Sequence, residues 1–255
     1  MIPIKNSVEI EKMRRVGAVA ALVLDEVCSQ IAVGVSTADL DDLTKEAMKR
    51  HGAESTTLGF RSGKKIFPGY GCFSINDEIV HGLPSAKKKL REGDIISVDL
   101  AMRVDGFVGD NTRTVAVGAI KPEIQHLIEV TQQALAAGIA AAVAGHRVGH
   151  ISAAIQRLAD ENGFGVVREL IGHGIGQAMH EAPEVPNYGI AGEGPELKAG
   201  MTLAIEPMFT LGTPKISVDA DGWTIRTADG QWASHCEHTV LITDGLPEIL
   251  TLLKK

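Results

Sequence analysis

Apolar residues recur at helical spacing in four segments of the chain. The first segment runs from Met13 to Ile31, and Asn6 with Glu9 three residues later has the spacing of a helix capping box just before it. The same spacing predicts three further helices, over residues 40–52, 122–144 and 151–161. Helices with one apolar face pack that face against a core.

Short segments rich in β-branched residues lie between and after these helices. A strand pattern is found at residues 72–79, 94–102, 107–117, 201–209 and 237–242. Two helices followed by a group of strands thus occur twice along the chain. This order predicts an α+β fold made from two similar halves, although the halves share too little sequence to define a repeat.

Two aspartates are predicted to meet across a hairpin. Asp105 and Gly106 stand between two apolar segments and form a dipeptide typical of a two-residue hairpin turn. That turn places Asp99 and Asp110 as diagonal neighbours on one face. The alternative is a turn at Asp110 with Asp99 as an edge charge. We favour the converging pair because an unpaired aspartate is rarely buried in an apolar run such as residues 95–101.

Three further side chains suited to metal binding stand in apolar or glycine-rich surroundings. His173 lies between two glycines, which let the backbone approach a ligand and disfavour a helix. Glu206 ends an apolar segment ahead of a proline, and Glu237 begins another. Each has a plainer interpretation on its own, since a single histidine is more often a core or surface residue and either glutamate is equally an edge charge.

Together, four carboxylates and one imidazole form a metal-binding set. Its members are Asp99, Asp110, His173, Glu206 and Glu237. Burying acidic groups among apolar residues is costly unless a cation compensates their charge. Oxygen ligands with one imidazole suit a pair of ions such as Mn²⁺, Fe²⁺, Co²⁺ or Zn²⁺, and such a pair activates water for hydrolysis. The set therefore predicts a two-metal hydrolase.

The composition argues against several other classes of protein. A net charge of −7 argues against DNA or RNA as the main partner, because phosphate binding needs a basic face. A basic run at residues 87–91 is interpreted as a solvated loop, with an anionic docking patch as the minor alternative. The 3 scattered cysteines indicate neither a disulfide framework nor a thiolate zinc site. No signal peptide or membrane span is recognisable, so we expect a soluble cytoplasmic protein with one catalytic domain over residues 1–255.

The segments that carry these residues resemble type I methionine aminopeptidases over nearly the whole chain. The similar segments are residues 76–84, 99–117, 172–188, 201–209 and 237–243. The resemblance is to the short bacterial form without a zinc-finger arm. It implies the pita-bread fold, in which two pseudo-symmetric halves form a central antiparallel sheet flanked by helices. It also implies removal of the initiator methionine from nascent proteins and peptides that have a small second residue.

The resemblance implies specific roles for the metal-binding set. Two divalent ions (Co, Mn, Fe, Zn or Ni) are expected, with Asp110 and Glu237 bound to both. Asp99 is expected on one ion, and His173 with Glu206 on the other.

The resemblance also implies catalytic and substrate-binding side chains. Glu206 is expected to take a proton from the attacking water and deliver it to the leaving amine. His180 is expected to help stabilise the oxyanion, and His81 to contact the departing peptide nitrogen. The substrate is expected to contact Phe60, Tyr70, Cys72, His81, Met179, His180 and Trp223. Without the resemblance, the pocket residues among these would be interpreted as ordinary core.

Two features depart from the family's pattern. The family commonly has Ser-Ala-Gln and an apolar or aromatic residue before the glutamate that matches Glu237, whereas this chain has Ala233, Ser234, His235 and Cys236. The contacts behind the ligand, and any monovalent-cation site nearby, therefore differ from the common pattern. The segment 60–72 is also longer than in many relatives.

Two other functions stay open at this point. A proline-specific aminopeptidase of the same fold usually carries an additional N-terminal domain, for which 255 residues leave no room. A non-enzymatic binding scaffold would have lost metal ligands, whereas all five positions hold suitable residues. The expected partners are nascent polypeptide N-termini and, transiently, the ribosome, while a membrane partner is not expected. Nothing in the sequence demands more than a monomer.

Overall fold

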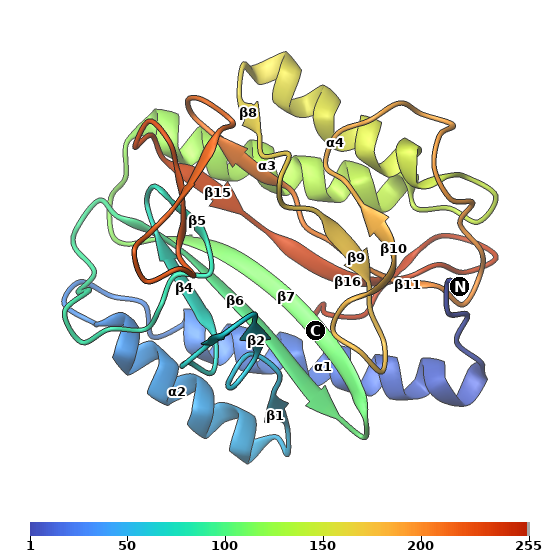
Figure 1. Ribbon diagram of the computed structural model, residues 1–255, viewed down its shortest axis with the longest axis horizontal. Helices are drawn as coiled ribbons and strands as arrows, with labels where there is room; N and C mark the ends of the chain where they lie inside the picture. Colours follow the sequence, from blue (N-terminus) through green and yellow to red (C-terminus); the bar gives the residue numbers. More distant parts are fainter. Residues whose placement is uncertain (254–255) are drawn as a thin grey trace.

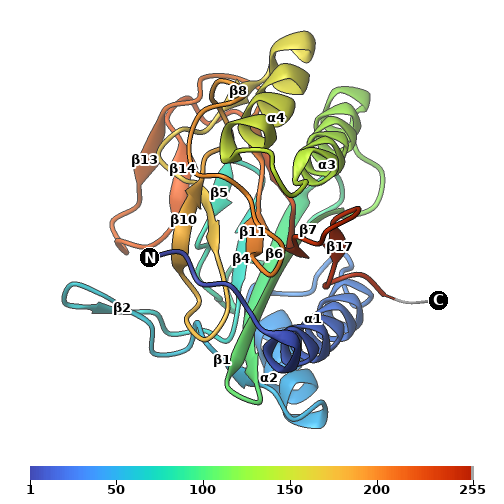
Figure 2. The same ribbon diagram turned by 90° about the vertical axis from the view of Figure 1, so that its right-hand side faces the viewer.

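Two pairs of helices lie against one face of a large sheet (Figure 1). The computed structural model describes residues 1–253. The first pair is α1 (Ser7–Cys28) and α2 (Thr37–Arg50), and the second is α3 (Pro122–Ala141) and α4 (Val148–Asn162). Figure 2 shows the helices on one side of the sheet and smaller hairpins on the other. One face of the sheet is therefore left for a site.

The strands follow the helices in two groups. In chain order they are β1 (Glu54–Ser55), β2 (Arg61–Ser62), β3 (Lys65–Ile66), β4 (Cys72–Ile75), β5 (Glu78–Val80), β6 (Ile95–Val104), β7 (Phe107–Ala116), β8 (Gly165–Val166), β9 (Gly172–Gly174), β10 (Glu181–Val185), β11 (Thr202–Ile205), β12 (Met208–Thr210), β13 (Ile216–Val218), β14 (Ile225–Thr227), β15 (Ala233–His235), β16 (Glu237–Leu241) and β17 (Glu248–Ile249). The central sheet has the order β1-β6-β7-β16-β11-β9-β10, with β4 beside β6 and β17 beside β16. Its neighbouring strands run antiparallel.

Each helix pair covers its own half of this sheet. In the first half, Met13 of α1 packs in a buried cluster with Val98 of β6. In the second half, Ile151 of α4 belongs to a separate cluster with Leu203 of β11 and Val240 of β16. The two halves join where β7 pairs with β16. The α+β architecture with two similar halves thus follows from two apolar helix pairs that each need a sheet face to cover.

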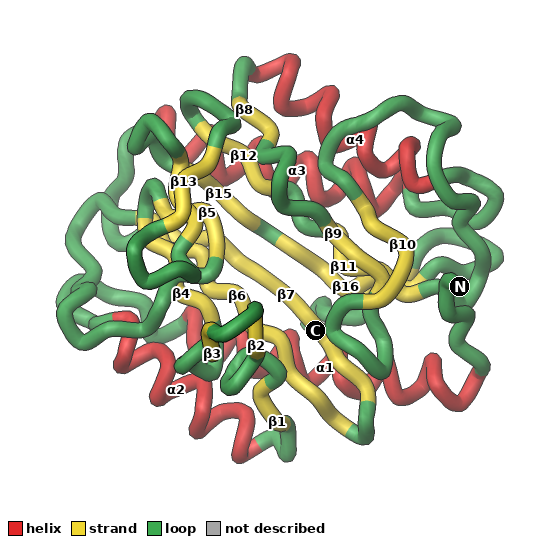
Figure 3. The backbone as a smooth tube through the Cα atoms, viewed as in Figure 1, coloured by secondary structure: helices red, strands yellow, loops and turns green. Residues whose placement is uncertain are grey.

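Three smaller sheets form the rim of the open face. They are β13-β14-β5, β15-β12-β8 and the hairpin β2-β3. Figure 3 shows these strands among the loops that surround the large sheet. Within residues 1–253, no helix is long and apolar enough to cross a membrane.

The capping box predicted for the first helix is confirmed. The Asn6 side chain accepts hydrogen bonds from the backbone nitrogens of Val8 and Glu9, and the Glu9 side chain accepts one from the backbone of Asn6. Helix α1 ends at Cys28 rather than Ile31. The other helix boundaries also differ by a few residues from the predicted ones, because terminal turns are weakly specified by spacing alone.

Two predicted strands are each divided in the structure. The predicted strand at residues 72–79 breaks at Asn76, whose φ of 56° belongs to a turn between β4 and β5. The predicted strand at residues 201–209 breaks at Glu206 and Pro207, between β11 and β12. Proline has no N–H to donate to a strand ladder, so the chain leaves one sheet and enters another.

Candidate active site

Two aspartates project from the β6–β7 hairpin to one side. Asp105 and Gly106 form its two-residue turn, with φ values of 51° and 82°. The resulting register places Asp99 opposite Thr112, two residues beyond Asp110. Asp99 and Asp110 therefore share a face, and both line one cavity. The alternative of a turn at Asp110 is wrong, because that residue lies within β7.

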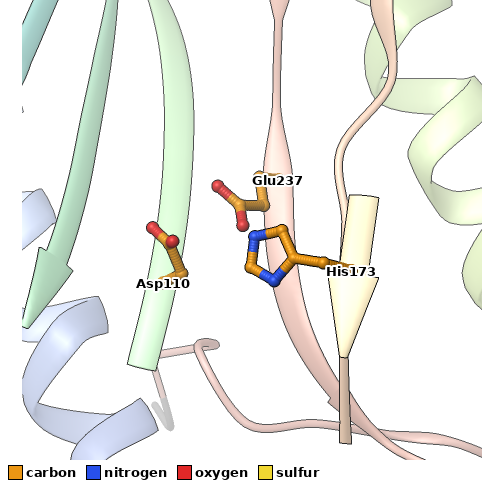
Figure 4. Close-up of side chains that lie close together, drawn as sticks. All are labelled: Asp110, His173 and Glu237. Atoms are coloured by element: carbon orange, nitrogen blue, oxygen red, sulfur yellow. The ribbon is translucent and has the colours of Figure 1, made fainter. Parts of the chain in front are cut away.

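The second half of the molecule supplies the other three predicted ligands. His173 lies in β9, Glu206 follows the end of β11, and Glu237 opens β16. Glu237 pairs across the joint between the halves with Thr112 of β7. Figure 4 shows Asp110, His173 and Glu237 pointing toward one another from three different strands. The joint thus brings together residues that are far apart in the sequence.

The separations within this cluster suit a bound cation. One ligand atom each of Asp110, His173 and Glu237 lies within 4.8 Å of the others. Glu206 Oε1 is 3.5 Å from His173 Nε2. His173 Nδ1 lies 2.9 Å from the Gly174 carbonyl oxygen, so it donates its proton there. That bond leaves Nε2 as a free acceptor, which is the arrangement typical of a metal-bound histidine.

The carboxylates of the cluster lack an internal positive partner. Within residues 1–253, no Lys or Arg forms a salt bridge with Asp99, Asp110, Glu206 or Glu237. Asp110 Oδ1 and Glu237 Oε1 are buried without a hydrogen-bond partner. Bound cations with oxygen preference would satisfy both the charge and the unbonded oxygens. The residues present therefore fit divalent metal ions.

Burial and mutual repulsion shift the pKa values of these carboxyl groups upward. Burial raises the pKa of Asp110, Glu206 and Glu237 well above their ordinary values, and the neighbouring carboxylates raise them further. Burial raises the pKa of Asp99 to about 6, partly offset by hydrogen bonds with Thr112 and Cys72. By contrast, burial lowers the pKa of His173 to about 4, which keeps its ring neutral. The metal-free cluster thus holds protons that a metal would displace.

The predicted substrate residues surround the same cavity, with one exception. A cavity of about 610 Å³ is lined by Phe60, Cys72, His81, Met179, His180 and Trp223 together with the five candidate ligands. Trp223 makes edge contacts with Phe60 and Phe67, at ring-centre distances of 6.4 and 5.3 Å. Cys72 pairs with Asp99 on the adjacent strand, and both residues line the cavity. The structure does not place Tyr70 among the lining residues, and its ring lies near the Lys45 ammonium instead.

The two histidines predicted to act on the substrate, His81 and His180, both line the cavity beside the cluster. His180 contacts His173 edge-on at 4.5 Å and Phe60 at 5.9 Å between ring centres. His81 has a φ of 59°, in the left-handed region that non-glycine residues rarely adopt. Such strain is retained where the surrounding structure fixes a residue for function. Burial, with a smaller contribution from the charge of His180, lowers the pKa of His81 to about 4.

Two residues at the site were not identified from the sequence as site residues. The Thr112 hydroxyl donates a hydrogen bond to Glu237 Oε2 at 2.9 Å and so orients that carboxylate. His235 lines the cavity, with Nε2 at 3.8 Å from Glu206 Oε2 and both ring nitrogens without a hydrogen-bond partner. Their spacing was an available signal, because Thr112 follows Asp110 by two residues and His235 precedes Glu237 by two.

Comparison with known proteins identifies the class of enzyme that this fold and site define. Residues 11–244 match the model of metallopeptidase family M24, and the chain belongs to that family. A metallopeptidase requires a metal site, in agreement with the carboxylate cluster.

The more specific similarity is to methionine aminopeptidases. The methionine aminopeptidase of Clostridium acetobutylicum is 46% identical over 252 residues, covering 99% of both chains. Methionine aminopeptidase 1 of Bacillus subtilis is 41% identical, covering 98% of this chain and 99% of that protein. The crystal structure of methionine aminopeptidase from Thermotoga maritima matches with a TM-score of 0.94 and 41% identity, covering 98% and 99% of the two chains. These findings confirm the family resemblance seen in the sequence.

More distant structures show the fold alone. A prolidase from Pyrococcus furiosus matches with a TM-score of 0.79 at 23% identity, and this chain covers 66% of it. The pita-bread architecture is therefore shared between methionine aminopeptidases and prolidases, and the predicted fold is confirmed.

Proposed function

We propose that this protein is a methionyl aminopeptidase that removes the N-terminal methionine from nascent proteins and peptides by metal-dependent hydrolysis. The observation that carries the proposal is the uncompensated cluster of Asp110, His173 and Glu237 inside the cavity. The near full-length similarity to methionine aminopeptidases supports the substrate. We take residues 1–255 as a single catalytic domain with a preference for a small second residue.

The metal centre is proposed to hold two divalent ions, drawn from Co, Mn, Fe, Zn or Ni. Asp99, Asp110, His173, Glu206 and Glu237 would hold these ions. Bound ions supply Lewis acidity and lower the pKa of a water at the centre. The unbonded oxygens of Asp110 and Glu237 and the free Nε2 of His173 support this assignment.

Glu206 is the proposed proton carrier of the reaction. Its carboxylate lines the cavity, with Oε1 at 3.5 Å from His173 Nε2. From there it takes a proton from the attacking water and delivers it to the amine of the departing chain. A raised pKa suits a group that must hold that proton between the two transfers.

The two histidines of the cavity are proposed to act on the peptide group. His180 donates to the oxygen that gains charge when the carbonyl is attacked. His81, which lines the same cavity, contacts the peptide nitrogen that leaves. The neutral ring of His81 supports a role as a hydrogen-bond partner rather than a fixed charge.

A cavity wall of sulfur and aromatic groups is proposed to bind the methionine side chain. Among the lining residues, Cys72 and Met179 carry sulfur atoms, and Phe60 and Trp223 carry aromatic rings. Polarisable sulfur and aromatic surfaces suit a thioether. Tyr70 is not among the lining residues, so it would act on the substrate only indirectly.

The cellular setting is proposed from the same function. A cytoplasmic monomer that acts on emerging chains would touch the ribosome transiently through the basic run at residues 87–91. Lys88 is not counted among the residues of this contact, because its ammonium group is 2.6 Å from Glu78 and is already paired. Lys87, Lys89 and Arg91 are exposed. Reversing these three charges should weaken ribosome co-sedimentation at low salt, and unchanged binding would exclude the patch.

Cleavage of Met-Ala-Ser compared with Ala-Pro-Ala tests the proposed substrate. The expected result is methionine release from the first peptide and no cleavage of the second. Preferential cleavage of Ala-Pro-Ala would instead support a proline-specific enzyme of the same fold. The similarity to prolidases is limited to the fold, so that second function is not favoured.

A further inference from the structure

A buried lysine links the start of the chain to the loop that carries His180. Lys5 lies just before α1, and its side chain is 5% exposed. Its ammonium group donates a hydrogen bond to Glu181 Oε2 at 2.6 Å. Glu181 is itself 11% exposed at its side chain and lines the active-site cavity. A charged pair this far from solvent fixes the relative position of the two segments that carry it.

The loop of residues 175–180 joins β9 to β10 and is packed around this pair. Glu181 Oε1 accepts a hydrogen bond from the backbone nitrogen of Ala178 at 3.2 Å. Gly176 lies beside the pair so closely that an added Cβ would be 2.6 Å from Lys5 Cε and 2.7 Å from Glu181 Oε1. The loop therefore closes over the lysine side chain, with Met179 and His180 on the stretch that leads to Glu181.

The lysine is anchored independently of that loop. Its backbone nitrogen donates to the carbonyl oxygen of Gly200 at 2.8 Å, next to β11. The following residue, Asn6, caps α1. Both views show the start of the chain passing beside the strands of the second half before it enters α1 (Figures 1 and 2). Lys5 thus holds the loop from a fixed point on the body of the protein.

We propose that Lys5 is a positioning residue for substrate cleavage, which holds His180 and Met179 in place through its ion pair with Glu181. The proposal rests on the proposed function, in which His180 and Met179 contact the substrate. The pair also neutralises Glu181 at the cavity wall. Without Lys5, a further unpaired carboxylate would face a cavity that already contains Asp99, Asp110, Glu206 and Glu237.

A double-mutant cycle between Lys5 and His180 tests the route of this effect. The variant Lys5→Met removes the charge while keeping a long side chain, and it should lower kcat/KM for Met-Ala-Ser about tenfold, mainly in kcat. In a His180→Ala background the same change should have little further effect, because the group that it positions is gone. An equal loss in both backgrounds, or no loss in the presence of His180, overturns the proposal.

Control variants separate positioning from folding. Arg14→Met breaks another ion pair of the same chain region, with Glu248, and should leave kcat/KM unchanged. If Lys5→Met alone does not fold, Lys5→Met with Glu181→Gln carries the same comparison, because replacing both members of a buried pair is often tolerated. Mn²⁺ binding should not be weakened in any Lys5 variant, since Lys5 contacts none of the candidate ligands.

Hydrogen exchange in the metal-free protein tests the same proposal without catalysis. Amides of residues 175–181 should exchange faster in Lys5→Met than in the wild-type chain, whereas Arg14→Met should not change them. Unchanged exchange in this loop contradicts the positioning role. Failure of the wild-type protein to release methionine would overturn the proposed function, and this exchange comparison would still decide whether Lys5 orders the loop.

Discussion

Two buried groups of carboxylates in this molecule are stabilised in opposite ways. Glu78 of β5 is 3% exposed and pairs with Lys88 at 2.6 Å and Arg226 at 2.7 Å. Glu237 of β16 is 2% exposed, accepts one hydrogen bond from Thr112, and has one oxygen without a partner. Both carboxylates are equally hidden from water, but only Glu78 is paired with positively charged side chains.

The difference separates a structural carboxylate from a functional one. A buried carboxylate needs positive charge or several donors to offset the loss of hydration. The chain supplies this charge to Glu78, and to Glu181 through Lys5. It supplies none to the cluster of Asp99, Asp110, Glu206 and Glu237, which therefore depends on external cations. Buried carboxylates without a Lys or Arg partner therefore distinguish the active site from buried carboxylates that are paired within the protein.

The largest effect on activity is expected from a change within the unpaired cluster. Glu206→Gln should leave metal largely bound and should lower methionine release at least about a hundredfold, because proton transfer is lost. Steady-state kinetics on Met-Ala-Ser, together with calorimetric Mn²⁺ titration, measures both. Glu169→Gln, at the exposed rim of the same cavity, is the matched control and should stay within about twofold of wild type. Near-normal turnover in Glu206→Gln would remove that residue from the mechanism.

A smaller effect is expected from pH, because acidification should weaken metal binding. The pKa of Asp99 in the metal-free protein is about 6, above its ordinary value, so the folded protein favours the protonated carboxyl group. The stability of the folded state that this proton contributes is lost as pH rises through 6. Metal binding must displace this proton at lower pH. Affinity for Mn²⁺ should therefore fall by at least about tenfold per pH unit below pH 6. Calorimetry in buffers of different ionisation enthalpy measures the released protons, and binding without proton release at pH 5.5 would contradict the raised pKa.

The smallest effect on activity is expected from a change beside Glu78, where the loss should appear in folding stability instead. Arg226→Met removes one of the two cations beside Glu78 and should lower the free energy of unfolding by about 2 kcal/mol. Lys88 remains as a partner, so the loss is smaller than for complete unpairing. Urea denaturation measures the change, and Mn²⁺ affinity should not move. A large loss of metal affinity in this variant would mean that the two carboxylate groups are coupled rather than separate.

The features that were predicted from the sequence are those that depend on residues close together in the chain. The Asp105-Gly106 turn determined the register of β6 and β7, and with it the shared face of Asp99 and Asp110. The capping box at Asn6 and Glu9 located the start of α1. Turn and capping chemistry act within a few residues, so a single sequence is enough to identify them.

Contacts between distant segments were not predicted. Lys5 and Glu181 are 176 positions apart, and neither stands in a pattern that indicates a partner. The closeness of His235 to Glu206 depends on the pairing of β15 with β12, which places His235 opposite Met208, and the spacing of His235 to Glu237 does not specify that pairing. The metal ligands were an exception, because their burial in apolar segments is itself a signal that something must compensate them.

The most direct test of the account is methionine release from Met-Ala-Ser by the chelator-stripped protein, with Mn²⁺, Fe²⁺, Co²⁺, Zn²⁺ or no metal added. We expect no release without metal and restored release with at least one ion, because the cluster of unpaired carboxylates requires cations to work. Equal release in the presence and absence of metal would contradict it, as would a failure of every ion to bind to the protein.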